Sequence, residues 1–246
     1  MKQSMRLIRY LAQAEVASRR KCEEIVKNGL VKVNERLVTN PFLVVNETDS
    51  ISVRGKPVAF TGDETVILLN KPAGIITTVK DPGKRKTVLD LVKTEKRLFP
   101  VGRLDKDTTG VLLLTNNGEL AYRLTHPKFQ IEKIYEVITD RLLTPSAVDR
   151  IRSGVDIGED ETGSGVVLSQ EFTAHPGKKS KVAMITLQLT HGKKREIRRI
   201  FKSLKYQVLL LHRKSVAHIK TGRLKHGQWR KLTEKEIVKL KKSVGL

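Results

Sequence analysis

Short apolar runs separated by turns rich in Pro and Gly constrain the fold of this 246-residue chain more than any other feature of its sequence. The runs 66–69 and 111–114 are continuously apolar, as is typical of buried strands, and 75–78 resumes as a strand after an Asn-Lys-Pro-Ala-Gly turn. A helix is expected at 119–124. Because strands and helices mix without regular alternation, the sequence predicts an α+β fold.

Several classes of protein are excluded by what the sequence lacks. Its apolar stretches fall short of the roughly 18 residues that a membrane helix needs. The basic segment at 1–10 lacks the apolar region and cleavage site of a secretory signal. The single cysteine, Cys22, forms neither an intramolecular disulfide nor a zinc cluster, and the six His show no metal-ligand spacing. We therefore expect a cytoplasmic protein with no membrane segment and no metal.

The charge of the chain indicates a polyanionic partner. Lys and Arg number 48 against 26 Asp and Glu, a formal net charge of +22. Residues 1–60 carry 11 basic and 6 acidic side chains, 61–190 carry 19 and 17, and 191–246 carry 18 and 3. Two basic ends around a balanced centre favour a long anion such as RNA, through counterion release. The alternatives are a basic protein without a nucleic-acid partner and, less favoured, a membrane-surface protein.

The first 58 residues form a small unit of their own. Apolar residues at helical spacing predict one helix from Leu7 and a second after Ser18, a good N-cap residue, and short strands follow. The second helix opens with Arg19, Arg20 and Lys21, in a turn where the helix dipole disfavours cations. These side chains are candidates to bind a phosphate backbone; the alternative is that they are merely solvated.

Three segments of this unit, 6–12, 16–20 and 29–34, resemble the S-four (S4) RNA-binding domain. That resemblance implies two helices joined to a small sheet, with the basic helix face on structured RNA. We accordingly expect an S4-like domain at 1–58, a linker at 59–65 and a second domain at 66–246.

Asp105 is the strongest candidate for chemistry. It lies in a loop between apolar segments, flanked by Gly102 and Gly110, and its neighbours Arg103 and Lys106 favour a negatively charged carboxylate. The alternative is an Asp that caps a turn through its own backbone.

The segment 102–118 resembles the signature of RNA pseudouridine synthases of the RsuA type, which act on ribosomal RNA. Further segments match in order, namely 69–74, 133–135, 195–201, 211–213 and 227–232. With the S4-like unit, the resemblance covers nearly the whole chain and implies a catalytic domain built on a mixed, mainly antiparallel sheet. The implied reaction breaks the bond between N1 of uracil and the ribose anomeric carbon, rotates the base and rejoins it through C5. It requires a carboxylate and no cofactor or redox change.

The resemblance also implies roles for individual residues. Asp105 is the essential carboxylate, which attacks the anomeric carbon, adds to uracil or removes a ribose proton. Tyr135 stacks on the target uracil, although a Tyr in a strand is more often a packing residue. Arg198 pairs with Asp105, and Arg103 either fills the gap left by the extruded nucleotide or serves as an electrostatic partner. Lys71 is interpreted as mainly structural.

The segment around Arg198 is an amphipathic helix. One face carries Ile197, Ile200, Phe201 and Leu204, and the other carries Arg195, Arg199 and Lys202 with Arg198 at the border. Arg198 is thus the arginine best placed to turn inward, and the other three cations are expected to meet phosphate. The alternative is that all four are solvated. Glu196 stands where the family usually has Gln, and we expect it to point away from Arg198.

The sequence thus predicts an enzyme that isomerises one uridine in ribosomal RNA, with the exposed Lys84 and Arg85 as further RNA contacts. We expect ribosomal RNA or a pre-ribosomal particle as its partner and a monomeric state. The alternatives are a non-catalytic RNA-binding factor in ribosome assembly that retains the fold and, less favoured, a related synthase that acts on tRNA.

Overall fold

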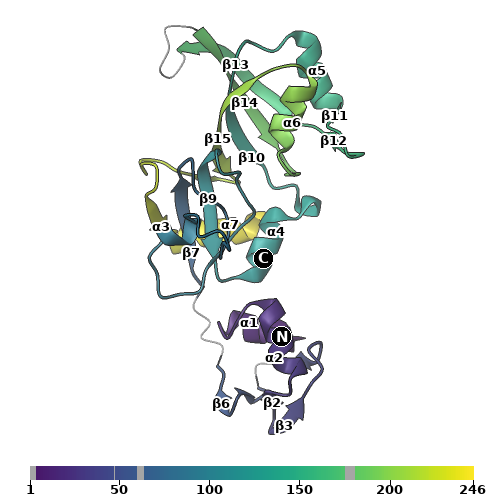
Figure 1. Ribbon diagram of the computed structural model, residues 1–246, viewed down its shortest axis with the longest axis vertical. Coiled ribbons are helices and arrows are strands. Elements are labelled where there is room, and N and C mark those ends of the chain that lie inside the picture. Colours follow the sequence, from purple (N-terminus) through teal and green to yellow (C-terminus); the bar gives the residue numbers. More distant parts are fainter. Residues whose placement is uncertain (1–3, 47, 60–63, 175–180) are drawn as a thin grey trace. The chain divides into compact units, whose positions relative to one another are not determined.

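The computed structural model describes residues 4–46, 48–59, 64–174 and 181–246, and its chain divides into two compact units (Figure 1). The first comprises 1–64 with 94–97 and 116–118, and the second comprises the remainder. Residues 60–63 of the expected linker lie outside the described residues. Among the described helices, none has the length and apolar character required to cross a membrane.

The first unit packs two helices against short strands. Its core is formed by apolar residues of both helices and of the strands, among them Leu11, Cys22 and Val31. Ser18 caps the second helix as predicted, because its side chain accepts a hydrogen bond from Lys21 N–H. The elements are α1 (Leu7–Gln13), α2 (Arg19–Lys27), a sheet in the order β3 (Arg36–Val38), β2 (Val31–Val33), β5 (Ile51–Val53), β6 (Lys56–Pro57), and the pair β1 (Met5–Arg6) with β4 (Val44–Val45).

The second unit is built on a nine-stranded mixed sheet. Its pairings are antiparallel except for β9 with β15, which run parallel, so the predicted mixed, mainly antiparallel sheet is confirmed. The strand order is β13 (Val166–Ala174), β14 (Lys181–Leu189), β10 (Lys133–Thr139), β15 (Val208–Val216), β9 (Thr109–Thr115), β7 (Val66–Lys71) and β17 (Trp229–Lys231), with β16 (Ile219–Lys220) on β15 and β8 (Phe99–Pro100) on β9.

Helices cover both faces of this sheet. On β7, Ile67 and Leu69 pack into the cluster that contains α5 and α6, whereas Val66 and Leu68 pack into the one that contains α4 and α7. Strand residues alternate between faces, so a strand covered on both sides reads as the continuous apolar run that the sequence displays. The helices are α3 (Val88–Leu91), α4 (Gly118–Thr125), the 3-10 turn η1 (Pro127–Phe129), α5 (Pro145–Ser153), α6 (Glu196–Ser203) and α7 (Glu234–Ser243); β11 (Val155–Asp156) pairs with β12 (Thr162–Gly163).

The prediction of a strand at 75–78 is wrong. This segment forms only an isolated bridge between Ile76 and Thr87. Thr77 is instead held by the loop before β9, since its hydroxyl donates to the Leu104 carbonyl at 2.8 Å and accepts from Leu104 N–H at 3.3 Å. A tertiary contact with the Asp105 loop therefore decides the local structure.

Candidate active site

The loop that carries Asp105 is fixed by a buried lysine. Lys71, at the end of β7, is fully buried, and its ammonium lies 2.9–3.1 Å from the carbonyl oxygens of Pro72, Asp105, Lys106 and Thr108. Burial lowers the pKa of Lys71 to about 8. Lys71 thus ties the backbone of Asp105 and of the residues that follow it to the end of β7, in agreement with the interpretation of Lys71 as mainly structural.

Gly110 allows a close approach of β9 and β15. Its φ is +106°, and a Cβ at this position would lie 2.2 Å from the Arg213 carbonyl oxygen. Arg213 and Gly110 are partners in the parallel register of these strands. A glycine is therefore required for Arg213 to lie beside the end of the Asp105 loop.

A cavity of about 510 Å³ opens over this loop. Its walls come from the loop itself, from β10 and β15, and from the start of α6. Asp105, Glu196 and Tyr135 line it together with eight cationic residues, namely Arg103, Lys106, Lys133, Lys193, Lys194, Arg195, Arg198 and Arg213. The predicted trio of Asp105, Tyr135 and Arg198 is thus brought together in one cationic cavity. Within the described part of the chain, no cluster of three or more His, Cys, Asp or Glu side chains could hold a metal ion.

Asp105 forms an ion pair with a different arginine from the expected one. Arg195 Nη1 lies 3.6 Å from Asp105 Oδ2, and the side chains are 51% and 32% exposed. The ion pairs of the described residues do not include Asp105 with Arg198. Arg195 precedes α6 with φ +52°, outside the helical face on which the sequence argument placed it. Arg198 lines the same cavity, and its Nε is buried without a hydrogen-bond partner.

Tyr135 lies in the middle of the sheet on β10. It is 8% exposed and is paired in register with Leu187 on β14 and Arg213 on β15. Its position is therefore that of a packed strand residue that also forms part of the cavity wall.

Two further cations of the cavity escaped the sequence argument. Arg213 is buried, its Nε donates to the Val111 carbonyl at 2.7 Å, and its Nη2 is buried without a partner. Lys133 donates to the carbonyls of Ile131 and Thr190, and burial lowers its pKa to about 8. The available signal was strand alternation, which places Lys133 on the same face as Tyr135 and Val137, and Arg213 on the same face as Leu211 and Ser215.

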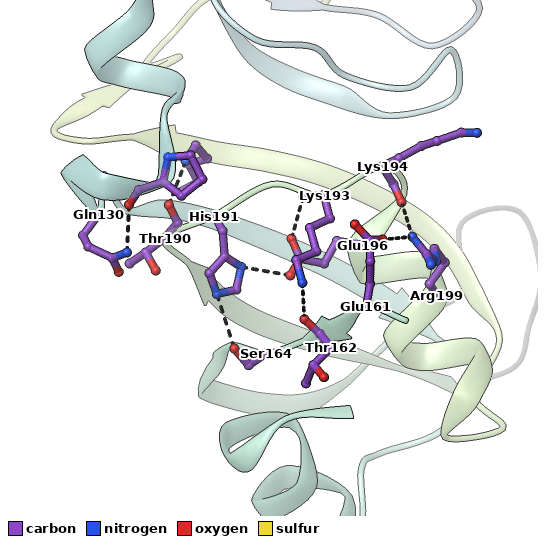
Figure 2. A network of polar contacts seen from close by, with 12 residues as sticks. Gln130, Glu161, Thr162, Ser164, Thr190, His191, Lys193, Lys194, Glu196 and Arg199 are labelled. Atoms are coloured by element: carbon purple, nitrogen blue, oxygen red, sulfur yellow. Dashed lines mark hydrogen bonds and ion pairs between the residues drawn. The ribbon is translucent and has the colours of Figure 1, made fainter. Parts of the chain in front are cut away.

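A polar network supports the loop before α6 (Figure 2). His191 Nδ1 lies 2.9 Å from Glu196 Oε1, while Glu196 Oε2 accepts from Lys193 N–H at 2.9 Å. His191 Nε2 is 3.3 Å from the Ser164 hydroxyl. Glu196 is buried and directed at this network, so the expectation that it points away from Arg198 is confirmed.

The other side chains predicted to bind RNA differ in whether the protein itself already binds them. Arg199 is engaged within the protein, because its guanidinium binds Glu161 at 2.5 Å and the carbonyls of Ile157 and Gly158. Its contact with phosphate stays a prediction. Arg85 is exposed but paired with Asp81 at 2.7 Å. The cations Arg19, Arg20, Lys21, Lys84, Arg103 and Lys202 are exposed.

Comparison with known proteins identifies the family. The model described as RNA pseudouridylate synthase matches residues 65–203, and that of the S4 domain matches 5–51. Ribosomal large subunit pseudouridine synthase B of Bacillus subtilis is 36% identical over 239 residues, covering 96% of this chain and 95% of the relative. An uncharacterized RNA pseudouridine synthase of Aquifex aeolicus is 35% identical, covering 98% and 96%. The dual-specificity RNA pseudouridine synthase RluF of Escherichia coli is 31% identical, covering 98% and 80%.

A solved structure agrees in fold. The crystal structure of a pseudouridylate synthase superposes with a TM-score of 0.64 at 24% identity, covering 96% of this chain and 99% of the other. Taken with the sequence relatives, the match extends over both units. The chain therefore belongs to the RNA pseudouridylate synthase family and is an isomerase of the RsuA type with an N-terminal S4 domain.

Proposed function

We propose that this enzyme isomerises a uridine of ribosomal RNA to pseudouridine, with Asp105 as the catalytic carboxylate. The observation that carries the proposal is the placement of Asp105 in a cavity lined by eight cationic side chains and Tyr135. A cavity of about 510 Å³ is of the size that holds one small ligand, and an extruded nucleoside fits that class. The similarity to the Bacillus subtilis ribosomal large subunit pseudouridine synthase B supports ribosomal RNA as the substrate class.

The proposed roles follow from chemistry and position. Asp105 acts on the nucleoside while the bond from N1 to the anomeric carbon breaks and the bond from C5 to that carbon forms. C5 loses a proton to solvent and N1 gains one, so the product is an isomer of the substrate. Tyr135 lies against the uracil. Arg198, with an unpartnered buried Nε, and Arg195, in contact with Asp105, hold the negative charges of the site. Arg103 fills the space that the extruded nucleotide leaves in the RNA.

The test measures release of tritium from unmodified ribosomal RNA transcripts that carry uridine tritiated at C5. Asp105→Asn is expected to lower the rate at least about a hundredfold. RNA affinity should hold or rise, because the substitution removes a negative charge from a cationic surface. Asp149→Asn, on the exposed side of α5, is the matched control and should retain full activity. Full activity of Asp105→Asn would refute the catalytic assignment.

The same assay separates the enzyme from a non-catalytic assembly factor. A factor that only binds would retain RNA affinity yet release no tritium from any ribosomal transcript. Release from tRNA transcripts but not from ribosomal RNA would indicate a tRNA enzyme and would overturn the proposed substrate class.

A further inference from the structure

An aromatic cluster, formed by Tyr122, His126 and Phe129, lies where α4 passes into η1. The Tyr122 and His126 ring centroids are 4.9 Å apart, and Phe129 meets Tyr122 edge-on at 5.8 Å. Phe129 also packs against the core cluster under α4. The three rings therefore form one contiguous surface that is anchored to the core at one end.

The other end of the cluster faces solvent. Tyr122 is 42% exposed and His126 is exposed. His126 Nδ1 accepts from Lys128 N–H at 3.2 Å, which fixes the ring direction. Phe, Trp and Tyr make up only 4% of the chain. Two adjacent exposed rings outside the apolar core therefore point to a ligand with a flat face.

A single available cation accompanies the rings. Lys128 Nζ lies 4.8 Å from the Phe129 centroid and 5.5 Å from that of Tyr122, and no carboxylate of the described residues pairs with it. Arg123 also approaches Phe129, but it is held by Glu119 and by the carbonyls of Val244 and Gly245. Exposed aromatic rings beside one ammonium without an ion pair match a nucleobase and its adjacent phosphate.

The cluster borders the catalytic cavity. Thr125, between Tyr122 and His126 in sequence, lines that cavity, and its methyl group lies 3.3 Å from where a Cβ on Gly102 would be. Arg103 follows Gly102 and also lines the cavity. A nucleotide next to the one inside the cavity would thus come within reach of the rings.

We propose that the aromatic cluster is a stacking site for an unpaired nucleobase of the RNA substrate, with Lys128 on its phosphate. This inference rests on the proposed function. Extrusion of the target uridine disrupts the stacking of its neighbours, and a stacking surface at the rim of the cavity compensates for that loss.

The test uses the full-length protein and two single-stranded probes without uridine. One is an RNA octamer of adenosines with 2-aminopurine at one position, and the other carries abasic riboses at its four central positions. Tyr122→Leu and His126→Leu are each expected to weaken binding of the first octamer by about 5- to 100-fold. Tyr122→Phe, which keeps the ring, should bind as the wild type does, and none of the three should alter binding of the abasic octamer.

Lys128→Gln separates the phosphate contact from stacking. It should weaken both octamers alike and lower the salt slope of binding by about 1. Equal affinity of the wild type, Tyr122→Leu and His126→Leu for the base-bearing octamer would overturn the proposal, as would an equal loss on the abasic octamer. Tritium release by the wild type is scored separately, so a neutral Tyr122→Leu in an active enzyme refutes only the stacking site.

Discussion

Lys71 stabilises the active-site loop without an ion pair among the described residues. Three ammonium protons lie among four backbone carbonyls, so at least one proton is shared. The ammonium binds carbonyls that approach it from several directions and so links several points of the backbone. An ion pair with one carboxylate would link it to only one side chain. The loop geometry around Asp105 therefore depends on a side chain that binds only backbone carbonyls.

Lys71→Met should destabilise the fold by about 2–4 kcal/mol, because it leaves buried carbonyls without donors. Activity measured well below the unfolding temperature should also fall, since the Asp105 backbone loses its anchor. Denaturant unfolding checks the first result, with the exposed Lys80→Met as control. Equal stability of the two variants would contradict the anchoring role.

Lys133 makes stability depend on pH in a defined window. Burial lowers its pKa from 10.5 to about 8, so between these values the unfolded chain binds more protons than the folded one. The unfolding free energy of the wild type should therefore rise relative to Lys133→Met as the pH increases from 8 to 10.5. The expected gain reaches about 3 kcal/mol at most. Denaturant titrations across this range test it, and a difference that is independent of pH would contradict it.

The sequence predicted which residues line the site, but it did not predict which of them form an ion pair. Asp105, Tyr135 and Arg198 do line one cavity, because the Asp105 loop, strand β10 and the first turn of helix α6 all border it. The pairing of Asp105 with Arg195 escaped prediction because it depends on the left-handed backbone at Arg195. Helical periodicity carries no information about a residue just outside the helix.

At the level of elements, α6 begins in an unusual way. Arg195 provides no side-chain cap, and the buried Glu196 carboxylate instead joins Lys193 N–H to His191 (Figure 2). An acidic residue in the first turn also suits the positive end of the helix dipole. The network thus sets where the helix starts and hence where Arg195 meets Asp105.

Substitutions of Glu196 should separate volume from charge. Glu196→Ala leaves the Lys193 N–H without its acceptor and is expected to cost about 1–3 kcal/mol of stability with a fall in kcat. Glu196→Gln keeps an acceptor oxygen and should lie closer to the wild type in both. Thermal unfolding and tritium release measure these effects, with Glu234→Ala at the exposed start of α7 as control. A larger loss for Gln than for Ala would contradict the proposed role.

An element could be predicted from the sequence where its own residue pattern determines it, and could not where a distant contact does. Strands β7 and β9 and helix α6 were evident because burial on two faces, or on one helical face, leaves a direct pattern in the sequence. The segment at 75–78, Ile-Ile-Thr-Thr, is β-branched throughout, as a strand often is, but the Thr77 hydroxyl binds the Leu104 backbone instead. A contact with a loop 27 residues away leaves no periodic signal.

At the scale of the whole molecule, the charges are placed for RNA binding in both units. Residues 191–246, in the second unit, hold 18 basic and 3 acidic side chains, and the S4 domain begins α2 with three exposed cations. The structure leaves Arg19 and Arg20 exposed in a helical turn where cations lower helix stability. A phosphate backbone on this turn would compensate for that cost.

Replacing Arg19, Arg20 and Lys21 together by Gln should therefore weaken RNA binding and reduce the slope of log Kd against log salt by about 2–3. The control replaces Arg150, Arg152 and Lys181, which are exposed and lie in the balanced stretch 61–190, so that net charge changes equally in both variants. Because α2 does not line the catalytic cavity, tritium release at saturating RNA should keep its kcat while KM rises. If the two triple variants change the salt slope by the same amount, binding responds only to total charge, and α2 is not a specific phosphate contact.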